Sequence, residues 1–355
     1  MMNKPDIMSM MPEELAEFVK ALGEKPFRAS QLFSWMARGV EIDEMTNLSK
    51  AFREKLKENA DYRLPKIEQK LVSQIDGTVK YLFALNDGEC VESVVMRYEH
   101  GTTICVSTQA GCAMGCKFCA STLRGRIRNL TPSEILGQVA VASRDTGERI
   151  DGVVMMGIGE PLDNYDNVIR FLRLVSHKDG LGIGLRHISL STCGIVPKIY
   201  DLAAEGMPVT LSVSLHAADD DVRDALMPIN KKYKIAELLS ACKHYFEKTG
   251  RRVSFEYTLI SEKNDSAEDA AHLADVIKRG MRASAHVNLI LLNEVKETGL
   301  VTPSRQRARA FAAELERHGV NATIRRTLGS DINASCGQLR LSKISSEQAG
   351  AEQIQ

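Results

Sequence analysis

Residues 103–119 read TICVSTQAGCAMGCKFC, an apolar run followed at once by a loop with three closely spaced cysteines. Cys112, Cys116 and Cys119 have the spacing C-x3-C-x2-C. Three thiolates on one tight loop can hold three irons of a [4Fe–4S] cluster, because soft sulfur ligands suit iron clusters. The fourth iron would lack a protein ligand and could bind a small molecule. This stretch therefore predicts an open cluster site directly after a buried strand.

A zinc site is the alternative interpretation of the same cysteines. Structural zinc usually takes four ligands, often from paired C-x2-C knuckles. Here the second pair is missing, and no histidine follows at zinc-finger spacing. The spacing therefore favours the cluster over zinc.

Outward from this stretch, apolar strands alternate with amphipathic helices. The later strand candidates are Val153–Met156, His187–Thr192, Val209–His216, Val253–Ile260, His286–Leu292 and Ala322–Arg326. Helical patterns begin at the capping box Thr131–Glu134 and continue over residues 165–177, 234–248, 266–279 and 303–318. This alternation predicts an α/β fold, a parallel sheet with outer helices that forms a partial or complete barrel. In such barrels the chemistry gathers at the C-terminal ends of the strands.

Four segments follow from these patterns. Helices are expected from Pro12, after Pro26 and over Ser49–Asn59, and the turn signals Asp76-Gly77 and Asn86-Asp87-Gly88 predict hairpins. The expected segments are an N-terminal helical accessory domain (1–65), a β-meander linker (66–101), the barrel (102–341) and a flexible tail (342–355).

Composition narrows the class of protein. Lys and Arg number 46, as do Asp and Glu, and a balanced charge argues against a protein dedicated to nucleic acid. No apolar run approaches the roughly 20 residues that span a bilayer, and the N-terminus has no signal core. We therefore expect a cytoplasmic protein. Its eight cysteines should be thiols, ligands or catalysts rather than structural disulfides.

Several further motifs accompany the cysteine loop. They are Val106–Cys112, Met155–Leu162, Gly194–Pro197, Ser214–Ala217, Met227–Asn230 and Asp331–Leu339. Together with Phe118 before the last loop cysteine, they resemble the RlmN/Cfr family of radical S-adenosylmethionine (SAM) enzymes that methylate adenine in RNA. The N-terminal motifs Phe27–Leu32 and Asp43–Leu48 are closer to the RlmN branch. The resemblance covers about residues 10–341, and Ser335 stands where the family often has alanine.

The resemblance implies a radical SAM partial (β/α)6 barrel with one [4Fe–4S] cluster and SAM as cofactors. One SAM methylates Cys336, and a second is cleaved to a 5′-deoxyadenosyl radical that takes a hydrogen atom from this methyl group. The methylene radical then adds to adenine C2, which is not nucleophilic. Cys105 attacks the Cys336 sulfur, releases the product and leaves a disulfide, and Glu92 is the base that removes the C2 proton. From the residues alone, Cys105 fits a buried core thiol equally well, and Glu92 fits an exposed hairpin position.

Residues at the ends of strands are implied to bind SAM. They are Gly159, Glu160, Ser191, Ser214, Leu215, His216 and Asn293. Glu160 is expected to meet the methionine amine, since a carboxylate pairs naturally with an ammonium group. The simpler interpretations are a turn at Gly159-Glu160 and a satisfied core histidine at His216.

The implied substrates are an adenosine of 23S rRNA at the peptidyl-transferase centre and the adenosine 3′ to the anticodon of tRNA. A Cfr-like enzyme acting on adenine C8, which gives antibiotic resistance, shares every residue named above. A zinc-stabilised RNA-binding protein without catalysis is the alternative of another class. We further expect a monomer that receives electrons from flavodoxin or ferredoxin and contacts RNA through Arg124, Arg126 and Arg128.

Overall fold

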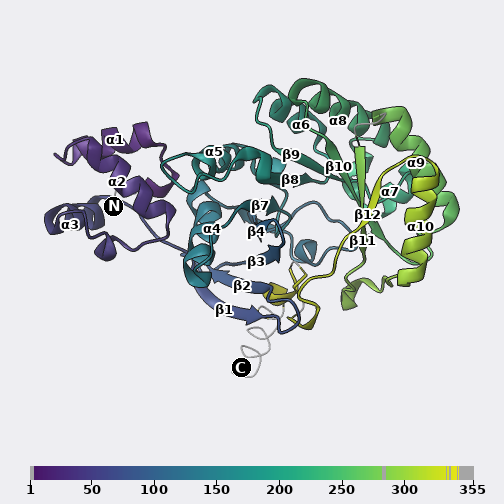
Figure 1. Cartoon of the computed structure of the whole chain (residues 1–355), viewed down its shortest axis with the longest axis horizontal. Coiled ribbons are helices and arrows are strands. Elements are labelled where there is room, and N and C mark those ends of the chain that lie inside the picture. Colours follow the sequence, from purple (N-terminus) through teal and green to yellow (C-terminus); the bar gives the residue numbers. More distant parts are fainter. Residues whose placement is uncertain (1–3, 282–284, 333, 336, 342, 344–355) are drawn as a thin grey trace.

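The structure, a computed structural model, describes residues 4–281, 285–332, 334–335, 337–341 and 343. The N-terminal part contains the three expected helices, which are α1 (Pro12–Ala21), α2 (Phe27–Ala37) and α3 (Lys50–Asn59). Ser49 caps α3 by accepting a hydrogen bond from the backbone N–H of Phe52. These helices form a compact group beside the sheet (Figure 1).

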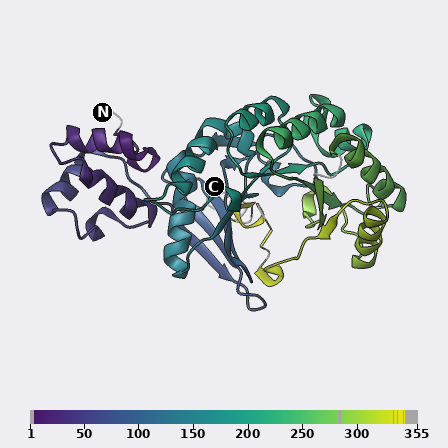
Figure 2. The ribbon, with the colours of Figure 1, turned by 45° about the horizontal axis from the view of Figure 1, so that its top comes forward.

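In the described part of the chain, ten strands form one sheet in the order β1-β2-β3-β4-β7-β8-β9-β10-β11-β12. The parallel strands are β4 (Gly101–Cys105), β7 (Gly152–Met155), β8 (Ile188–Thr192), β9 (Thr210–Ser214), β10 (Val253–Leu259), β11 (Ala285–Leu291) and the short β12 (Ala322–Ile324). The sheet curves with helices on its outer side (Figures 1 and 2). The predicted α/β partial barrel is confirmed.

The outer helices bury their apolar faces against this sheet. They are α4 (Pro132–Thr146), α5 (Tyr165–Ser176), α6 (Val196–Ala204), α7 (Asp220–Leu226), α8 (Ile235–Thr249), α9 (Ala267–Met281) and α10 (Arg305–Arg317). The capping box at the start of α4 forms as predicted, with both of its reciprocal hydrogen bonds present. The sequence patterns miss α6 and α7, because nine and seven residues are too short for a clear helical period.

The antiparallel strands β1 (Lys66–Val72), β2 (Val79–Ala84) and β3 (Cys90–Tyr98) continue the same sheet past β4. The expected linker is thus an edge extension of the barrel sheet, and residues 90–96 of β3 are buried. The segment after β12 returns to this extension, where Ser73 Oγ donates a hydrogen bond to Asp331 Oδ1 at 2.7 Å. Figure 1 shows this segment in yellow beside β1 and β2.

The division into domains stays a prediction, and the expected tail 342–355 lies outside the described residues except for Lys343. Among the described residues, no helix has the length and apolar character needed to cross a membrane.

Candidate active site

The three predicted cluster ligands lie on one loop between the short antiparallel strands β5 (Gln109–Gly111) and β6 (Arg126–Asn129). Cys112, Cys116 and Cys119 all line the same cavity at the C-terminal ends of the parallel strands, which we call the cysteine cavity. Burial raises the pKa of the Cys112 thiol to about 12. Three thiols facing one cavity form the donor set that a cluster with one open iron requires.

Hydrogen bonds from within the loop and from α7 fix its shape. Thr122 Oγ1 donates to the carbonyl oxygens of Cys116 and Cys119 at 3.1 and 3.0 Å. The Lys117 N–H donates to the carbonyl oxygen of Leu226, the last residue of α7, at 2.9 Å. The loop is therefore held both by its own side chain and by the neighbouring helix.

Apolar side chains surround the loop. Met114 and Phe118 from the loop pack against the buried side chains of Met227, Ile260 and Leu292. A hydrophobic shell around a metal centre limits the access of water and lowers the local dielectric constant. This environment fits a redox cluster better than a solvent-exposed thiol site.

Five of the seven predicted SAM-binding residues line the cysteine cavity. They are Gly159, Glu160, Ser191, Ser214 and His216. The other two lie elsewhere: Leu215 is fully buried in the main core, and Asn293 lines a neighbouring cavity. The structure thus brings most of the predicted set together around the three thiols.

Glu160 joins the ends of β7 and β8. Its Oε1 accepts a hydrogen bond from the Leu162 N–H at 3.0 Å, and its Oε2 accepts one from the Cys193 N–H at 2.7 Å. Its own N–H donates to Gln109 Oε1 at 2.8 Å. Burial raises the pKa of the Glu160 carboxyl group. Each oxygen accepts one backbone bond and can accept another, so a role toward the SAM amine stays a prediction.

His216 lies between the cysteine loop and β10. Its Nδ1 accepts the Thr258 N–H at 2.9 Å, and its ring packs edge-on against Phe118 with 4.8 Å between ring centroids. Burial lowers the pKa of His216 to about 3, so the imidazole is neutral and carries its proton on Nε2. The residue also adopts a left-handed backbone conformation (φ 56°), which marks a constrained position at the cavity.

Arg223 is a residue that the sequence analysis missed. Its side chain is fully buried and donates to the carbonyl oxygens of Cys193, Ser214 and Leu215 and to Asn230 Oδ1, each at 2.9 Å. One guanidinium therefore joins the ends of β8 and β9 beside the cavity. An arginine in a short acidic helix gives no sequence signal for this role.

We expect Arg223→Met to lower the free energy of unfolding by about 3 kcal/mol, because the change leaves several buried acceptors without donors. Urea denaturation of the variant and of the unchanged protein measures this loss. Arg173→Met is the matched control, since Arg173 pairs with Glu205 at the surface and its loss should cost about 0–1 kcal/mol. Equal losses for the two variants would contradict the assigned structural role.

Glu256 on β10 is a second residue that the sequence analysis missed. It lines the cysteine cavity, and its Oε1 accepts a hydrogen bond from Asn288 Nδ2 at 2.9 Å. Its Oε2 is buried and has no hydrogen-bond partner within the described part of the chain. Leaving such an acceptor unsatisfied is costly, so a ligand with donor groups fits here. The hydroxyl and amine groups of SAM would supply such donors.

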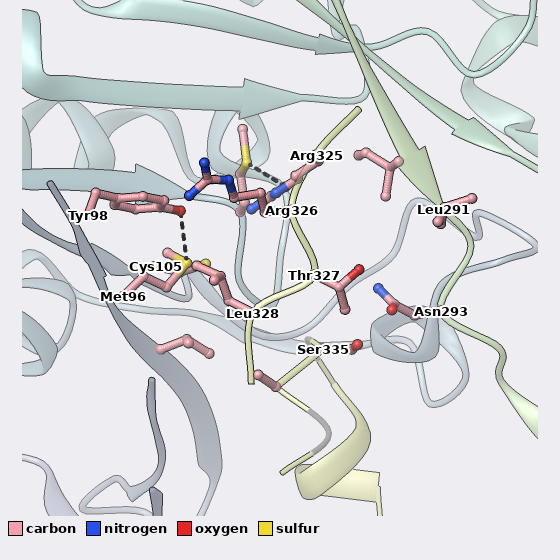
Figure 3. A pocket seen from close by; sticks show the side chains of 14 residues that line it. Met96, Tyr98, Cys105, Leu291, Asn293, Arg325, Arg326, Thr327, Leu328 and Ser335 are labelled. Carbon is pink, nitrogen blue, oxygen red and sulfur yellow. Dashed lines mark hydrogen bonds between the residues drawn. The ribbon is translucent and has the colours of Figure 1, made fainter. Parts of the chain in front are cut away.

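A second cavity adjoins the first and contains Cys105. The two cavities share Met156, Ile290 and Arg325 in their walls. Figure 3 shows the Cys105 cavity, which is also lined by Val94, Met96, Tyr98, Leu291, Asn293, Arg326, Thr327, Leu328, Ala334 and Ser335. The cavity thus combines a thiol, an aromatic ring and two arginines.

Two further residues, Glu92 and Cys336, are predicted to be catalytic. Glu92 is buried on β3, lines neither cavity and accepts a hydrogen bond from the Gly337 N–H at 2.8 Å. Cys336 lies outside the described residues, although Ser335 before it lines the Cys105 cavity. The structure therefore places Cys105 and Ser335 at one cavity, and the roles of Cys105 and Cys336 stay predictions.

The predicted disulfide is not supported. Seven cysteines of the described part, Cys105 among them, are thiols. In the same part of the chain, no group of three or more His, Cys, Asp or Glu side chains is arranged to hold a single metal ion. The cluster assignment therefore rests on the spacing of the cysteines and the cavity that they share.

The predicted RNA-contacting arginines differ in their surroundings. Arg126 forms an ion pair with Asp163, and Arg128 binds Asp87 and Glu134. Arg124 is exposed beside the cysteine loop. The internal ion pairs of Arg126 and Arg128 reduce the charge that these two residues offer to phosphates.

Comparison with known proteins places these features in a family. Residues 106–274 match the profile of the Radical SAM superfamily, and residues 5–61 match that of the ribosomal RNA large subunit methyltransferase N-terminal domain. A Clostridium botulinum protein named "Probable dual-specificity RNA methyltransferase RlmN" is 51% identical over 348 residues, which are 98% of this chain and 99% of that protein. A protein of the same name from Alkaliphilus oremlandii is 51% identical over 340 residues, or 96% of this chain and 98% of its own.

A solved structure shows the same architecture. The radical SAM methyltransferase from Sphaerobacter thermophilus superimposes with a TM-score of 0.90 and is 41% identical. The match covers 94% of this chain and 98% of that structure, so it includes the N-terminal helices, the barrel and the antiparallel extension.

Proposed function

This chain belongs to the RlmN family of radical SAM RNA methyltransferases, and on that premise we propose that it methylates C2 of an adenosine in 23S rRNA and in tRNA. The rRNA target would lie in the peptidyl-transferase centre, and the tRNA target 3′ to the anticodon. The observation that carries the proposal is the pair of adjoining cavities, one with three loop thiols and the other with Cys105.

The two cofactors would occupy the first cavity. Cys112, Cys116 and Cys119 would hold a [4Fe–4S] cluster, while Gly159, Glu160, Ser191, Ser214 and His216 would contact SAM together with Glu256. When bound, the cluster and SAM supply the methyl group and a carbon-centred radical. The apolar wall around the loop would exclude water from this reaction.

The second cavity would take the target adenosine, turned out of the RNA because C2 is hidden within a paired helix. Tyr98 offers a ring for stacking against the base, and Arg325 and Arg326 offer charge for the flanking phosphates. These two arginines give the cavity a local positive charge that attracts phosphates, although the net charge of the chain is zero. Asn293, which the resemblance assigns to SAM binding, lines this second cavity and would contact SAM from there.

Two thiols and one carboxyl group would act on the adenosine. Cys336 would carry the methyl group before it reaches the base, and Cys105 would supply the thiol that frees the product. Glu92 would remove the C2 proton, which requires it to come within hydrogen-bond reach of that carbon. We further expect a cytoplasmic monomer, with a flavodoxin- or ferredoxin-type protein as electron donor.

The test is the identity of the modified nucleoside. We expect the anaerobically purified, brown protein to convert unmodified 23S rRNA and tRNA to products that contain 2-methyladenosine, as measured by mass spectrometry against nucleoside standards. A product with 8-methyladenosine would support the Cfr-like alternative instead. A colourless protein that contains zinc and leaves both RNAs unmodified would support the RNA-binding alternative.

A further inference from the structure

A buried ion pair joins the two inner strands of the antiparallel extension. Lys80 Nζ on β2 lies 3.1 Å from Glu92 Oε2 on β3, and the two side chains are 0% and 2% exposed. In the strand register, Lys80 faces Val94 and Glu92 faces Leu82. Lys80 and Glu92 therefore point from the same face of the sheet, as diagonal neighbours.

This pair binds the chain on both sides of Cys336. Lys80 Nζ donates to the Ser335 carbonyl oxygen at 2.6 Å, and Glu92 Oε2 accepts the Gly337 N–H at 2.8 Å. Glu92 Oε1 accepts the Arg340 N–H at 2.7 Å. Both sequence neighbours of the predicted methyl-carrying cysteine are thus held by charge-assisted hydrogen bonds, which are stronger than neutral ones.

The opposite side of the same segment contacts the end of the cluster loop. Gly337 has a φ of +83°, and a Cβ atom there would lie 2.8 Å from Ser121 Oγ and 3.0 Å from the Ser121 nitrogen. Ser121 follows Cys119 by two residues. Only glycine fits between the ion pair and the loop, so the chain at Gly337 is held next to the loop that carries the predicted cluster ligands.

Further bonds along the segment support this placement. Asp331 Oδ2 accepts the Gln74 N–H at 2.8 Å, and Asp76 Oδ2 accepts the Gly329 N–H at 2.8 Å. The Arg340 guanidinium donates to Glu89 Oε2 at 2.9 Å. A buried ion pair alone is weak evidence for stability, because desolvation offsets its attraction. This pair is one of several contacts that hold residues 329–340, which indicates that it helps to position this segment.

We propose that Lys80 and Glu92 form a clamp that positions the Cys336 segment against the cluster loop, with Lys80 as a positioning residue. This inference rests on the proposed function, in which Cys336 receives the methyl group. Three donors bind the buried Glu92 carboxyl group, so the carboxylate that would act as the base also holds this segment. The clamp therefore acts on the step in which Cys336 would receive the methyl group, and this step precedes the proton removal assigned to Glu92.

The decisive experiment uses Lys80→Met and Glu92→Gln in the cluster-containing protein. In both variants the Gly337 amide should exchange its hydrogen at least about tenfold faster, because Lys80→Met removes the cation that holds its acceptor and Glu92→Gln removes the charge of that acceptor. Methylation of Cys336, followed by peptide mass spectrometry without RNA, should slow by about a hundredfold, as expected for a reacting group displaced by about 1 Å. Iron content should not change.

Lys66→Met is the matched control, since Lys66 is an exposed lysine on the same extension and should behave as the unchanged protein does. If Glu92 were only a base, Glu92→Gln would methylate Cys336 at the normal rate, and this result would overturn the clamp. Unchanged exchange of the Gly337 amide in both variants would overturn it as well. Should Lys80→Met fail to fold, the isosteric Glu92→Gln carries both measurements.

The two proposals fail in different ways. If the unchanged protein does not methylate Cys336 at all, the proposed function is wrong, while hydrogen exchange at Gly337 still decides whether the clamp exists. If Cys336 is methylated normally in both variants, the clamp is wrong and the proposed function stands.

Discussion

Replacement of Cys112 by alanine is expected to remove the cluster and reduce RNA methylation to the uncatalysed background, a loss of about a millionfold or more. Cys112 is one of the three thiols that line the cysteine cavity. A [4Fe–4S] cluster held by only two thiolates would have two irons without protein ligands. Iron and sulfide analysis, visible absorption and nucleoside mass spectrometry measure the effect.

Cys242→Ala provides the control for this variant. Cys242 is fully buried on α8 and lines neither the cysteine cavity nor the Cys105 cavity. Its loss should leave the iron content and the methylation rate close to those of the unchanged protein. A Cys112→Ala protein that retains its iron and its activity would refute the assignment of the loop.

Replacement of Cys105 by alanine is expected to trap the protein on its RNA. The methyl group would still be transferred to Cys336 and then attached to the adenine, because this variant keeps Cys336 and the three thiols of the cysteine cavity. The thiol that frees the product would be missing. Cys105 lines the same cavity as Ser335, the residue before Cys336 in the sequence. A denaturing gel should show a slow protein–RNA species, and peptide mass spectrometry should locate the attachment at Cys336.

The double variant Cys105→Ala, Cys336→Ala is the control for the trapped species. It should give no adduct and no methylated RNA, since no residue remains to carry the methyl group. The role of Cys105 would be contradicted if Cys105→Ala kept its cluster but formed no adduct during turnover. Normal release of product by this variant would contradict it as well.

Much of the fold could be predicted from the sequence because its strands are continuously apolar. Buried parallel strands such as β10 leave a clear signal between amphipathic helices. The pattern fails for short elements, since β5 has three residues and α7 has seven. It also fails for β3, where alternation suggests an exposed Glu92, because the C-terminal segment covers the face that Glu92 occupies.

Some residues of the candidate site could likewise be predicted from the sequence, and others could not. The cysteine loop has a characteristic spacing, while the roles of Glu160 and His216 are implied by the resemblance of their short motifs to the family, and both residues line the same cavity. Arg223, Lys80 and Glu256 act through partners that are distant in sequence or through an unsatisfied atom, so no local pattern reveals them. A lysine or glutamate within an otherwise apolar strand is the weak signal that could have identified the last two.

The long separation in sequence between the clamp and the segment that it holds has a consequence for folding. Lys80 and Ser335 are 255 residues apart, so their contact is among the least local in the fold. Such contacts close late, because the loop entropy must be overcome before they contribute. We therefore expect the barrel to fold before the Cys336 segment docks. A newly made chain would form the cavity with the three loop cysteines first and would add the segment that contains Cys336 last.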